Sequence, residues 1–137
     1  MTQTMRRGTY ILLLDFNSLK DIEVGSLGLL HFDKGRYCYV GSAMGGLDQR
    51  VSRHLRKEKK VRWHIDRLTM AADSTEAWIS YPEPISECDL AHCAEGCGMI
   101  PVHKGFGCSD CSCHTHLFMV AEGSESRLID VCSLTRF

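Results

Sequence analysis

Residues 36–55 read RYCYVGSAMGGLDQRVSRHL, and the spacing of the apolar side chains changes in the middle of this stretch. Residues 36–41 alternate as a β-strand does, with successive side chains on opposite faces. After the two glycines, Leu47, Val51 and Leu55 recur at every fourth position, which is typical of an amphipathic helix. The stretch therefore predicts a strand that leads through a turn into a helix.

The residues before this stretch predict two more strands. Residues 9–16 and 27–32 are apolar and rich in strand-forming residues, and a polar stretch separates them. The tight turn signal Asp-Lys-Gly at residues 33–35 joins the second of these strands to residues 36–41. We therefore expect a central three-stranded antiparallel sheet.

The residues after the stretch predict helices and short extra strands. In chain order we expect a helix over residues 63–72, a strand over 76–81, a third helix signalled by Ser86 and ending near Glu95, a Gly/Cys/Ser/His-rich loop over 105–114, and short strands over 117–121 and 128–131. Strands followed by helices indicate an α+β fold. The 137 residues contain no repeat or proline-rich linker, which favours one domain over residues 1–137 with its core at about residues 8–121.

The composition places the chain among globular proteins. Hydrophobic residues make up 44% and charged residues 24%, which excludes a disordered or coiled-coil chain. The longest strongly apolar run, residues 10–14, is far shorter than the roughly 20 residues of a membrane span, and residues 1–8 lack a signal-peptide pattern. We therefore expect a cytoplasmic protein with no membrane partner. In that compartment its eight cysteines are expected to be thiols or metal ligands.

Positive charge is concentrated in one segment. Residues 50–67 carry eight basic and two acidic side chains, whereas residues 68–137 carry three basic and ten acidic ones. Such a cluster suits the backbone of a nucleic acid, although a solvated helix face is the alternative. The side chains that we expect to bind nucleic acid are Arg53, Arg56, Lys57, Lys59, Lys60 and Arg62.

Two tripeptides lie on the first and third expected strands, GTY at residues 8–10 and YVG at residues 39–41. Together with YCYVGSA, GGLDQRVSRH, WHID, SEC and GFGCSDCSCHTHLF, they form an ordered set that resembles the GIY-YIG nuclease superfamily. The set is most similar to its small Uri-like branch, which is sometimes fused to endonuclease III. The resemblance implies a compact domain in which the tripeptides lie side by side on neighbouring strands. Arg50 and His54 then follow on the next helix, on one face.

The resemblance also implies an activity, which is metal-dependent hydrolysis of nucleic-acid phosphodiesters by an endonuclease of DNA repair. It makes Tyr10 or Tyr39 the base that deprotonates water and Arg50 the cation that stabilises developing charge. His54 and His64 would bind the phosphate or relay a proton. The same side chains have structural interpretations, as half-buried strand aromatics, a surface arginine and a packed histidine. An endonuclease III-type repair enzyme is the implied protein partner.

The resemblance requires an acidic residue on the third helix that holds one divalent metal ion. Glu87 heads this helix within the SEC element, and an oxygen ligand of this kind suits Mg²⁺ or Mn²⁺. Glu95, two turns later, is the second choice. Alternatively, Glu87 and Asp89 are acids in a first turn that Ser86 caps, and there they stabilise the helix dipole.

The loop near the end of the chain gives a separate signal. Cys108, Cys111, Cys113 and His116 place three soft ligands and a histidine within nine residues, with His114 as an alternative, and a closed Zn²⁺ site needs four ligands. The loop could instead line the nuclease site through Asp110 and His116, or serve packing alone. The other cysteines are expected to be small buried apolar residues. They are Cys38, Cys88, Cys93, Cys97 and Cys132.

Two other classes of function stay open. A non-catalytic nucleic-acid-binding accessory module of DNA repair would use the basic segment but would need neither Tyr10 nor Glu87. A small zinc-stabilised interaction domain would depend only on the cysteine-rich loop.

Overall fold

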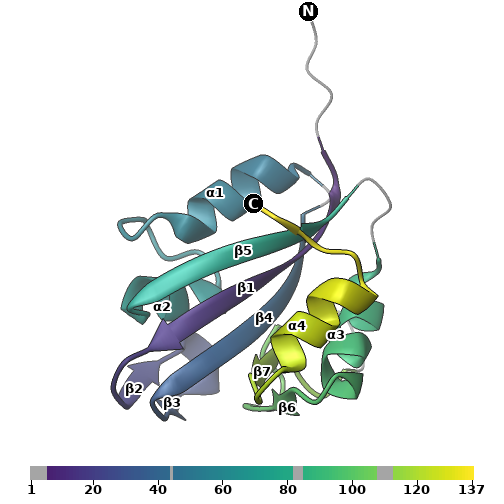
Figure 1. Ribbon diagram of the computed structural model, residues 1–137. Helices are drawn as coiled ribbons and strands as arrows, with labels where there is room; N and C mark the ends of the chain where they lie inside the picture. Colours follow the sequence, from purple (N-terminus) through teal and green to yellow (C-terminus); the bar gives the residue numbers. More distant parts are fainter. Residues whose placement is uncertain (1–5, 44, 82–84, 108–112) are drawn as a thin grey trace, which may run out of the picture.

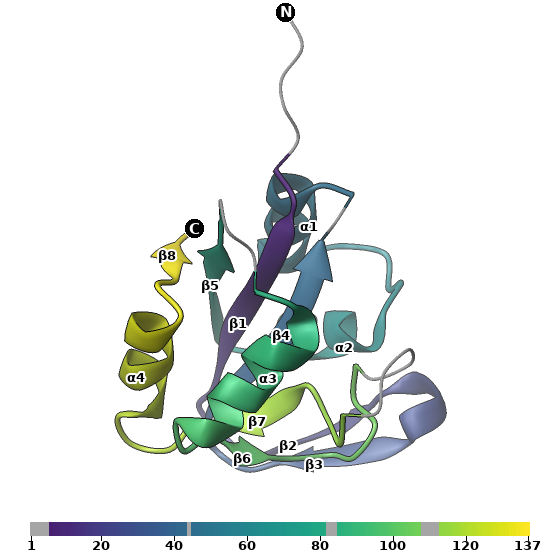
Figure 2. The same cartoon turned by 90° about the vertical axis from the view of Figure 1, so that its right-hand side faces the viewer.

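Six strands form one sheet at the centre of the computed structural model, with helices on both sides (Figures 1 and 2). The structure describes residues 6–43, 45–81, 85–107 and 113–137. In chain order the elements are β1 Gly8–Phe16, β2 Lys20–Glu23, the short 3-10 helix η1 Gly25–Leu27, β3 Leu29–Phe32, β4 Gly35–Ala43, α1 Leu47–Leu55, α2 His64–Ala71, β5 Ser74–Ser80, α3 Glu87–Gly96, β6 Ile100–Pro101, β7 Leu117–Met119, α4 Ser124–Val131 and β8 Thr135–Arg136.

The main sheet has the order β6-β7-β4-β1-β5-β8, and all of its neighbouring strands run antiparallel. Its centre is the pair β1 and β4, in register from Gly8 opposite Ala43 to Phe16 opposite Gly35. A mixed α+β fold is therefore confirmed, whereas the expectation of a three-stranded central sheet is wrong.

The difference lies in residues 27–32, which we expected as one strand of the central sheet. β3 pairs instead with β2 in a separate two-stranded sheet, and β1 and β4 pair directly. The strand β2 has the sequence KDIE and buries only Ile22, so its hydrophobic pattern is too weak to indicate a strand. Only Phe32 of β3 is buried, and it stacks on Phe16.

The alternation of β1 divides the core between the two faces of the sheet. Tyr10, Leu12 and Leu14 point towards α1 and α2, and Ile11 and Leu13 point towards α3 and α4. Figures 1 and 2 show these helix pairs on opposite sides of the sheet. Because β1 is buried on both faces, its sequence is a continuous apolar run.

The strand expected over residues 128–131 is wrong, since these residues end helix α4. Leu128 and Cys132 are buried four residues apart, which is a helical period. An apolar run of four residues is too short to distinguish a strand from a helix.

The expected third helix begins as predicted. Ser86 caps α3, and its hydroxyl accepts a hydrogen bond of 3.1 Å from the Asp89 amide. No helix in the described parts of the chain is long and apolar enough to cross a bilayer.

Candidate active site

The register of β1 and β4 places Tyr10 directly opposite Gly41. A Cβ atom at Gly41 would lie 2.5 Å from the Tyr10 hydroxyl oxygen and 2.6 Å from its Cζ atom. The tyrosine ring therefore lies across the glycine of the neighbouring strand, which explains physically why a tyrosine and a glycine occupy these two positions.

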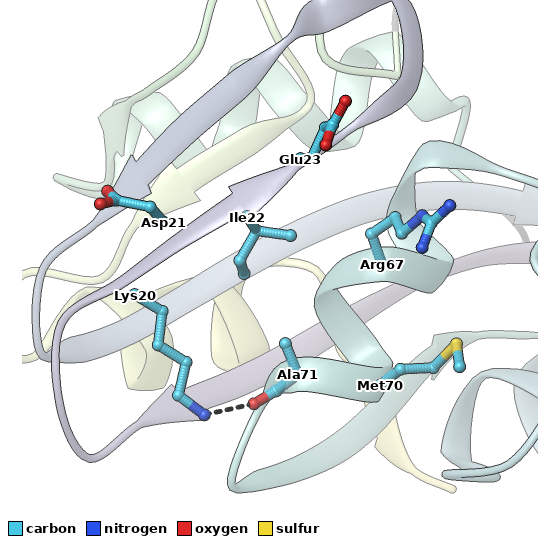
Figure 3. Close-up of a pocket in the computed structure, with 7 residues that line it drawn as sticks. All are labelled: Lys20, Asp21, Ile22, Glu23, Arg67, Met70 and Ala71. Atoms are coloured by element: carbon cyan, nitrogen blue, oxygen red, sulfur yellow. Dashed lines mark hydrogen bonds between the residues drawn. The ribbon is translucent and has the colours of Figure 1, made fainter.

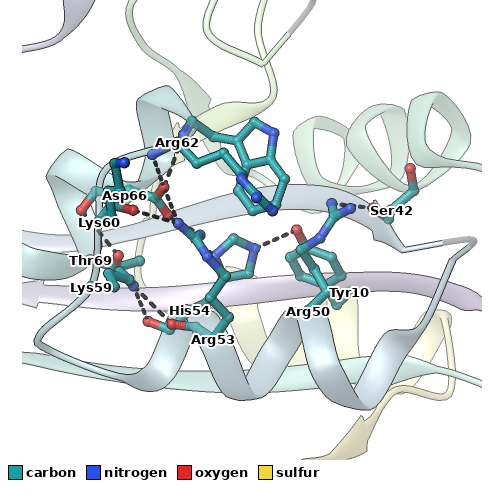
Figure 4. A network of polar contacts seen from close by, with 11 residues as sticks. Tyr10, Ser42, Arg50, Arg53, His54, Lys59, Lys60, Arg62, Asp66 and Thr69 are labelled. Carbon is teal, nitrogen blue, oxygen red and sulfur yellow. Dashed lines mark hydrogen bonds and ion pairs between the residues drawn. The ribbon is translucent and has the colours of Figure 1, made fainter.

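Helix α1 supplies a histidine to this tyrosine. Tyr10 Oη lies 2.7 Å from His54 Nε2, and both side chains are buried (Figure 4). Burial, and after it the positive charge of Lys59, lowers the pKa of His54 to about 4. His54 is therefore a neutral imidazole at pH 7. In the tautomer with its proton on Nδ1, Nε2 accepts a hydrogen bond from the phenol.

A guanidinium lies beside this pair. Arg50 Nη1 donates a hydrogen bond of 3.2 Å to the Ser42 carbonyl, and the Arg50 guanidinium carbon stands 4.3 Å from the centre of the Trp63 ring. Burial raises the pKa of Tyr10, while the charge of Arg50 and a hydrogen bond from it oppose the rise. Arg50 therefore stabilises negative charge at the Tyr10 oxygen.

A buried ion pair holds α1 against α2. The Arg53 guanidinium donates two hydrogen bonds, of 2.7 and 2.9 Å, to the fully buried carboxylate of Asp66. The same carboxylate accepts hydrogen bonds from the amides of Arg62 and Trp63. These bonds lower the pKa of Asp66 although burial opposes them, so the carboxylate stays ionised. Asp66 Oδ1 lies 4.0 Å from His54 Nδ1.

Tyr10, His54 and Arg50 line a cavity of about 470 Å³ between α1, α2 and the segment before β7. Its wall includes all five residues that the sequence predicts as catalytic: Tyr10, Tyr39, Arg50, His54 and His64. Gly107 closes it from the loop side with φ +73°, and a Cβ atom there would lie 3.1 Å from the Tyr39 ring. The clustering of these five positions was not visible in any single motif.

Trp63, Phe106 and Asp66 were not predicted as parts of the site. Trp63 and Phe106 line the cavity, and Asp66 forms the ion pair with Arg53 that holds α1 against α2. The only sequence signal for Trp63 and Asp66 was the WHID segment, in which Trp63 precedes His64 and Asp66 follows two residues later.

The basic side chains divide into two groups. Arg53, Lys57 and Lys59 bond within the chain: Lys57 donates to the carbonyl of Ala72, and Lys59 donates to those of Arg53 and His54. Burial lowers the pKa of Lys59 to about 8. The exposed basic residues of the segment include Arg56, Lys60 and Arg62, and Arg62 reaches the cavity wall.

Glu87 approaches the same end of β4 from the other face of the sheet. Its Oε1 atom lies 2.6 Å from His116 Nδ1, and the Ser42 hydroxyl bonds to its carboxylate. Burial would raise the pKa of Glu87, but these bonds lower it, so the group is ionised. Its charge acts on both Arg50 and Tyr10.

The other acidic residues of α3 give no evidence of a second metal ligand. Asp89 and Glu95 are exposed, and Asp89 follows the Ser86 cap as the helix-dipole interpretation expects. Glu87 is an acid in the first turn of α3 whose carboxylate also contacts His116 and Ser42.

Part of the predicted zinc site can be located. Cys108, Asp110 and Cys111 lie outside the described residues. Cys113 and His116 come together with Cys88, which the sequence did not suggest as a ligand. His114 is exposed.

The expectation of buried cysteines is only partly correct. Cys38 and Cys132 are buried. Cys88, Cys93 and Cys97 are partly exposed, although Cys93 and Cys97 still pack against the core cluster that contains Leu90, Ala91 and Ala94.

A second hollow of about 570 Å³ lies between β2 and α2 (Figure 3). Lys20 Nζ donates a hydrogen bond of 2.6 Å to the Ala71 carbonyl there and so closes the end of α2. Asp21 and Glu23 add negative charge to the wall. Lys20 and Arg67 add positive charge, so the wall of this hollow carries both signs.

Comparison with known proteins identifies the chain at the level of the family. The family model described as "Domain of unknown function DUF123" matches residues 9–135. Neither the curated proteins nor the solved structures contain a match. Since this match covers nearly the whole chain and reaches from β1 into β8, the chain belongs to the DUF123 family.

Proposed function

We propose that this protein is a metal-dependent endonuclease of the GIY-YIG type that hydrolyses phosphodiester bonds in DNA. The observation that carries the proposal is the buried pair of Tyr10 and His54 beside Arg50, at the wall of a cavity. A phenol that can pass on its proton, next to a fixed positive charge, fits attack of water on a phosphate.

The pair acts as a proton relay. A neutral phenol accepts a proton from water only if it gives up its own, and His54 Nε2 is the atom positioned to receive it. His54 is neutral before the reaction. After the transfer, the carboxylate of Asp66, 4.0 Å from Nδ1, faces the imidazolium and stabilises it.

Arg50 acts on the other partner of the reaction. Its guanidinium is held in place by the Ser42 carbonyl and the Trp63 ring. A guanidinium fixed before the reaction stabilises the charge that develops on the phosphoryl oxygens without reorganising in the transition state.

The residues at Glu87 fit a hard divalent cation. The Glu87 carboxylate is ionised and half-buried, and the Ser42 oxygen lies beside it. Magnesium binds through one or two carboxylates and keeps several waters, so Glu87 is a sufficient protein ligand. When bound, Mg²⁺ or Mn²⁺ would supply charge neutralisation at the phosphate and at the leaving oxygen.

The basic segment supplies affinity for DNA. Arg56, Lys60 and Arg62 are exposed, and Arg62 also lines the cavity. Lysine and arginine side chains in such an arrangement bind phosphates regardless of base sequence.

The experiment is a cleavage assay with Tyr10→Phe and a matched control. The protein is incubated with flapped, nicked and branched DNA in Mg²⁺ or Mn²⁺. Tyr10→Phe removes only the relay oxygen and is expected to reduce the cleavage rate at least about 10²-fold, as general acid–base catalysis contributes. Tyr37→Phe removes a hydroxyl that bonds to the Asp33 carbonyl, away from the cavity, and is expected to keep the rate.

Equal rates for Tyr10→Phe and Tyr37→Phe would contradict the relay. Absence of metal-dependent cleavage across the whole panel, with DNA binding intact, would favour the second candidate function, a non-catalytic DNA-binding accessory module. The exposed basic side chains favour that candidate, because they need no catalytic pair.

A further inference from the structure

Two thiols and an imidazole from distant parts of the sequence meet beside Glu87. The ligand atoms of Cys88, Cys113 and His116 all lie within 4.8 Å of one another. Cys88 stands in the first turn of α3, Cys113 precedes β7 by several residues, and His116 directly precedes it. The packing of α3 beside the segment before β7 thus brings together three side chains that can bind a metal ion.

The chemistry of this group selects a soft or borderline metal ion. Thiolate sulfur and imidazole nitrogen are the preferred ligands of Zn²⁺, with bonds of about 2.3 and 2.0 Å. In a tetrahedral site the ligand atoms are therefore about 3.5 to 3.8 Å apart. The separations within the group, at most 4.8 Å, therefore exceed these values by no more than about 1.3 Å, and the two cysteines are partly exposed.

The histidine of this group is already oriented. Its backbone amide donates to the Phe106 carbonyl at 2.8 Å, and its carbonyl accepts from the Val40 amide at 2.9 Å. Its Nδ1 atom lies 2.6 Å from Glu87 Oε1, so Nε2 is the nitrogen that a metal would take. A carboxylate on the second nitrogen is the usual support of a zinc-binding histidine.

The position of Cys88 adds to this argument. The ligand form of cysteine is the thiolate, and the first turn of a helix stabilises negative charge through its unpaired amides and dipole. Glu87 precedes Cys88 in the sequence, and its carboxylate contacts His116, so it is next to two of the three ligands.

We propose that Cys88, Cys113 and His116 bind one Zn²⁺ ion, with the fourth position taken by water or a further side chain. The ion ties the beginning of α3 to the chain before β7 and holds His116 and Glu87 in place. The sequence predicted Cys108, Cys111, Cys113 and His116 as the ligands. The described residues support Cys113, His116 and, in addition, Cys88. Its ligands are distinct from the Tyr10, His54 and Arg50 group that carries the proposed nuclease activity, and its test uses no cleavage assay.

The test measures metal content and cobalt spectra. Protein purified under reducing conditions without chelator is expected to contain about one equivalent of zinc by mass spectrometry. Replacing zinc by Co²⁺ is expected to give a thiolate-to-cobalt charge-transfer band. Cys88→Ser and Cys113→Ser should each remove one thiolate contribution from this band, and His116→Ala should lower zinc affinity at least about 10-fold. Cys93→Ser, on the same helix but outside the group, should keep both metal content and band.

A second measurement needs no variant and so does not depend on folding of a mutant. Alkylation of the native protein by iodoacetamide, mapped by peptide mass spectrometry, should be slow at Cys88 and Cys113 with zinc and at least about 10-fold faster after chelation. The rate at Cys93 should not change. Chelation should also lower the melting temperature, since metal binding contributes to folding free energy.

Two results would overturn the site. One is a protein that takes up neither zinc nor Co²⁺ after reduction and metal addition. The other is a full charge-transfer band in Cys88→Ser together with alkylation of native Cys88 that chelation does not change. Either result leaves the Tyr10 relay untouched, whereas loss of the relay leaves the metal measurements untouched.

Discussion

The two faces of the sheet carry different chemistry at the same end of β4. On the face of α1 lie a phenol, a neutral imidazole and a guanidinium, from Tyr10, His54 and Arg50. On the face of α3 lie a carboxylate and a second imidazole, from Glu87 and His116. The first set can move a proton and hold an anion, whereas the second set can hold a cation.

One residue connects the two sets. The carbonyl of Ser42 accepts a hydrogen bond from Arg50, and its hydroxyl bonds to Glu87. Because peptide carbonyl and side chain point in different directions along a strand, a single residue of β4 can serve both faces. The comparison predicts that damage to the α1 face affects chemistry, while damage to the α3 face affects the response to metal ions.

The largest expected effect separates these two faces in one assay. Arg50→Ala should lower the cleavage rate at least about 10²-fold, by comparison with loss of one charge-stabilising donor at an oxyanion site. DNA binding should persist, because exposed cations such as Arg56 and Lys60 remain. Glu87→Gln should abolish the dependence of the rate on Mg²⁺ concentration. The measurement is the initial rate over a series of Mg²⁺ concentrations.

The control for Arg50→Ala is Arg67→Ala, an exposed arginine of α2 that does not line the cavity. If Glu87→Gln lowers stability and leaves cleavage unchanged, Glu87 only stabilises the helix dipole. Cleavage that survives in the double variant Arg50→Ala, Glu87→Gln would point to a contaminating nuclease.

The second prediction concerns pH and the α1 face alone. The pKa of His54 is about 4 in the folded protein, against 6.5 for an exposed histidine. Below pH 6.5 the unfolded chain therefore binds a proton that the folded chain excludes until about pH 4. The contribution of His54 to stability is complete above pH 6.5 and is lost as the pH falls through this window, by about 3 kcal/mol.

Urea unfolding at several pH values checks this sign. His54→Gln lacks the titrating group and should show a free energy of unfolding that falls less between about pH 7 and pH 4 than that of the wild type. His92→Gln, an exposed histidine of α3, should behave as the wild type does. Parallel curves for the wild type and His54→Gln would show that His54 is not buried as a neutral group.

The regularity of the hydrophobic pattern determined how much of the fold the sequence could predict. Residues 36–55 predicted β4 and α1 because the strand-like alternation changes to a helical spacing at Leu47, Val51 and Leu55, but the sequence did not show that β4 is buried on both faces. The hairpin of β2 and β3 was missed because its strands are short and largely exposed, with Leu29 68% exposed. Pairing of β1 with β4 is a long-range property that local patterns do not contain.

The candidate site shows the same division. Tyr10, Arg50 and His54 could be proposed because they stand in short local motifs, GTY and GGLDQRVSRH, that resemble those of a known nuclease family. Cys88 could not be proposed, because it meets Cys113 only through the packing of α3 beside the segment before β7. A buried carboxylate such as Asp66 also has no local signature, since the partner that makes its burial possible lies on another helix.

The third prediction tests the contact between the two central strands. In Gly41→Ala the new methyl group would collide with the Tyr10 ring, 2.5 Å from its oxygen. The ring must move, which costs about 1 to 3 kcal/mol of stability and disrupts the bond to His54. Thermal or urea unfolding measures the loss. Gly45→Ala, at a position with open space, is the matched control.

Coupling with Tyr10 distinguishes this collision from a general effect of the sheet. The combined variant Tyr10→Ala, Gly41→Ala has no ring for the methyl group to meet, so the two losses should not add. Full additivity would show that Gly41 is required for a reason other than Tyr10.

The last and smallest effect concerns the basic segment. The sequence alone does not distinguish Lys57, Lys59 and Lys60 as phosphate-binding residues. In the structure, Lys57 and Lys59 donate hydrogen bonds to backbone carbonyls at the ends of α2 and α1. Each phosphate contact contributes about 0.9 to the slope of log affinity against log salt. Arg56→Ala, Lys60→Ala should therefore make the slope shallower by up to about 1.8, so that doubling the salt concentration changes the affinity ratio to wild type about 3-fold. Lys57→Ala, Lys59→Ala should change the slope less and lower the melting temperature more. Fluorescence anisotropy with labelled duplex DNA at several KCl concentrations gives the slopes.

The opposite ranking of the two double variants would mean that Lys57 and Lys59 leave their carbonyl partners when DNA binds, and that the surface facing DNA lies nearer to the end of α1 than to Arg62.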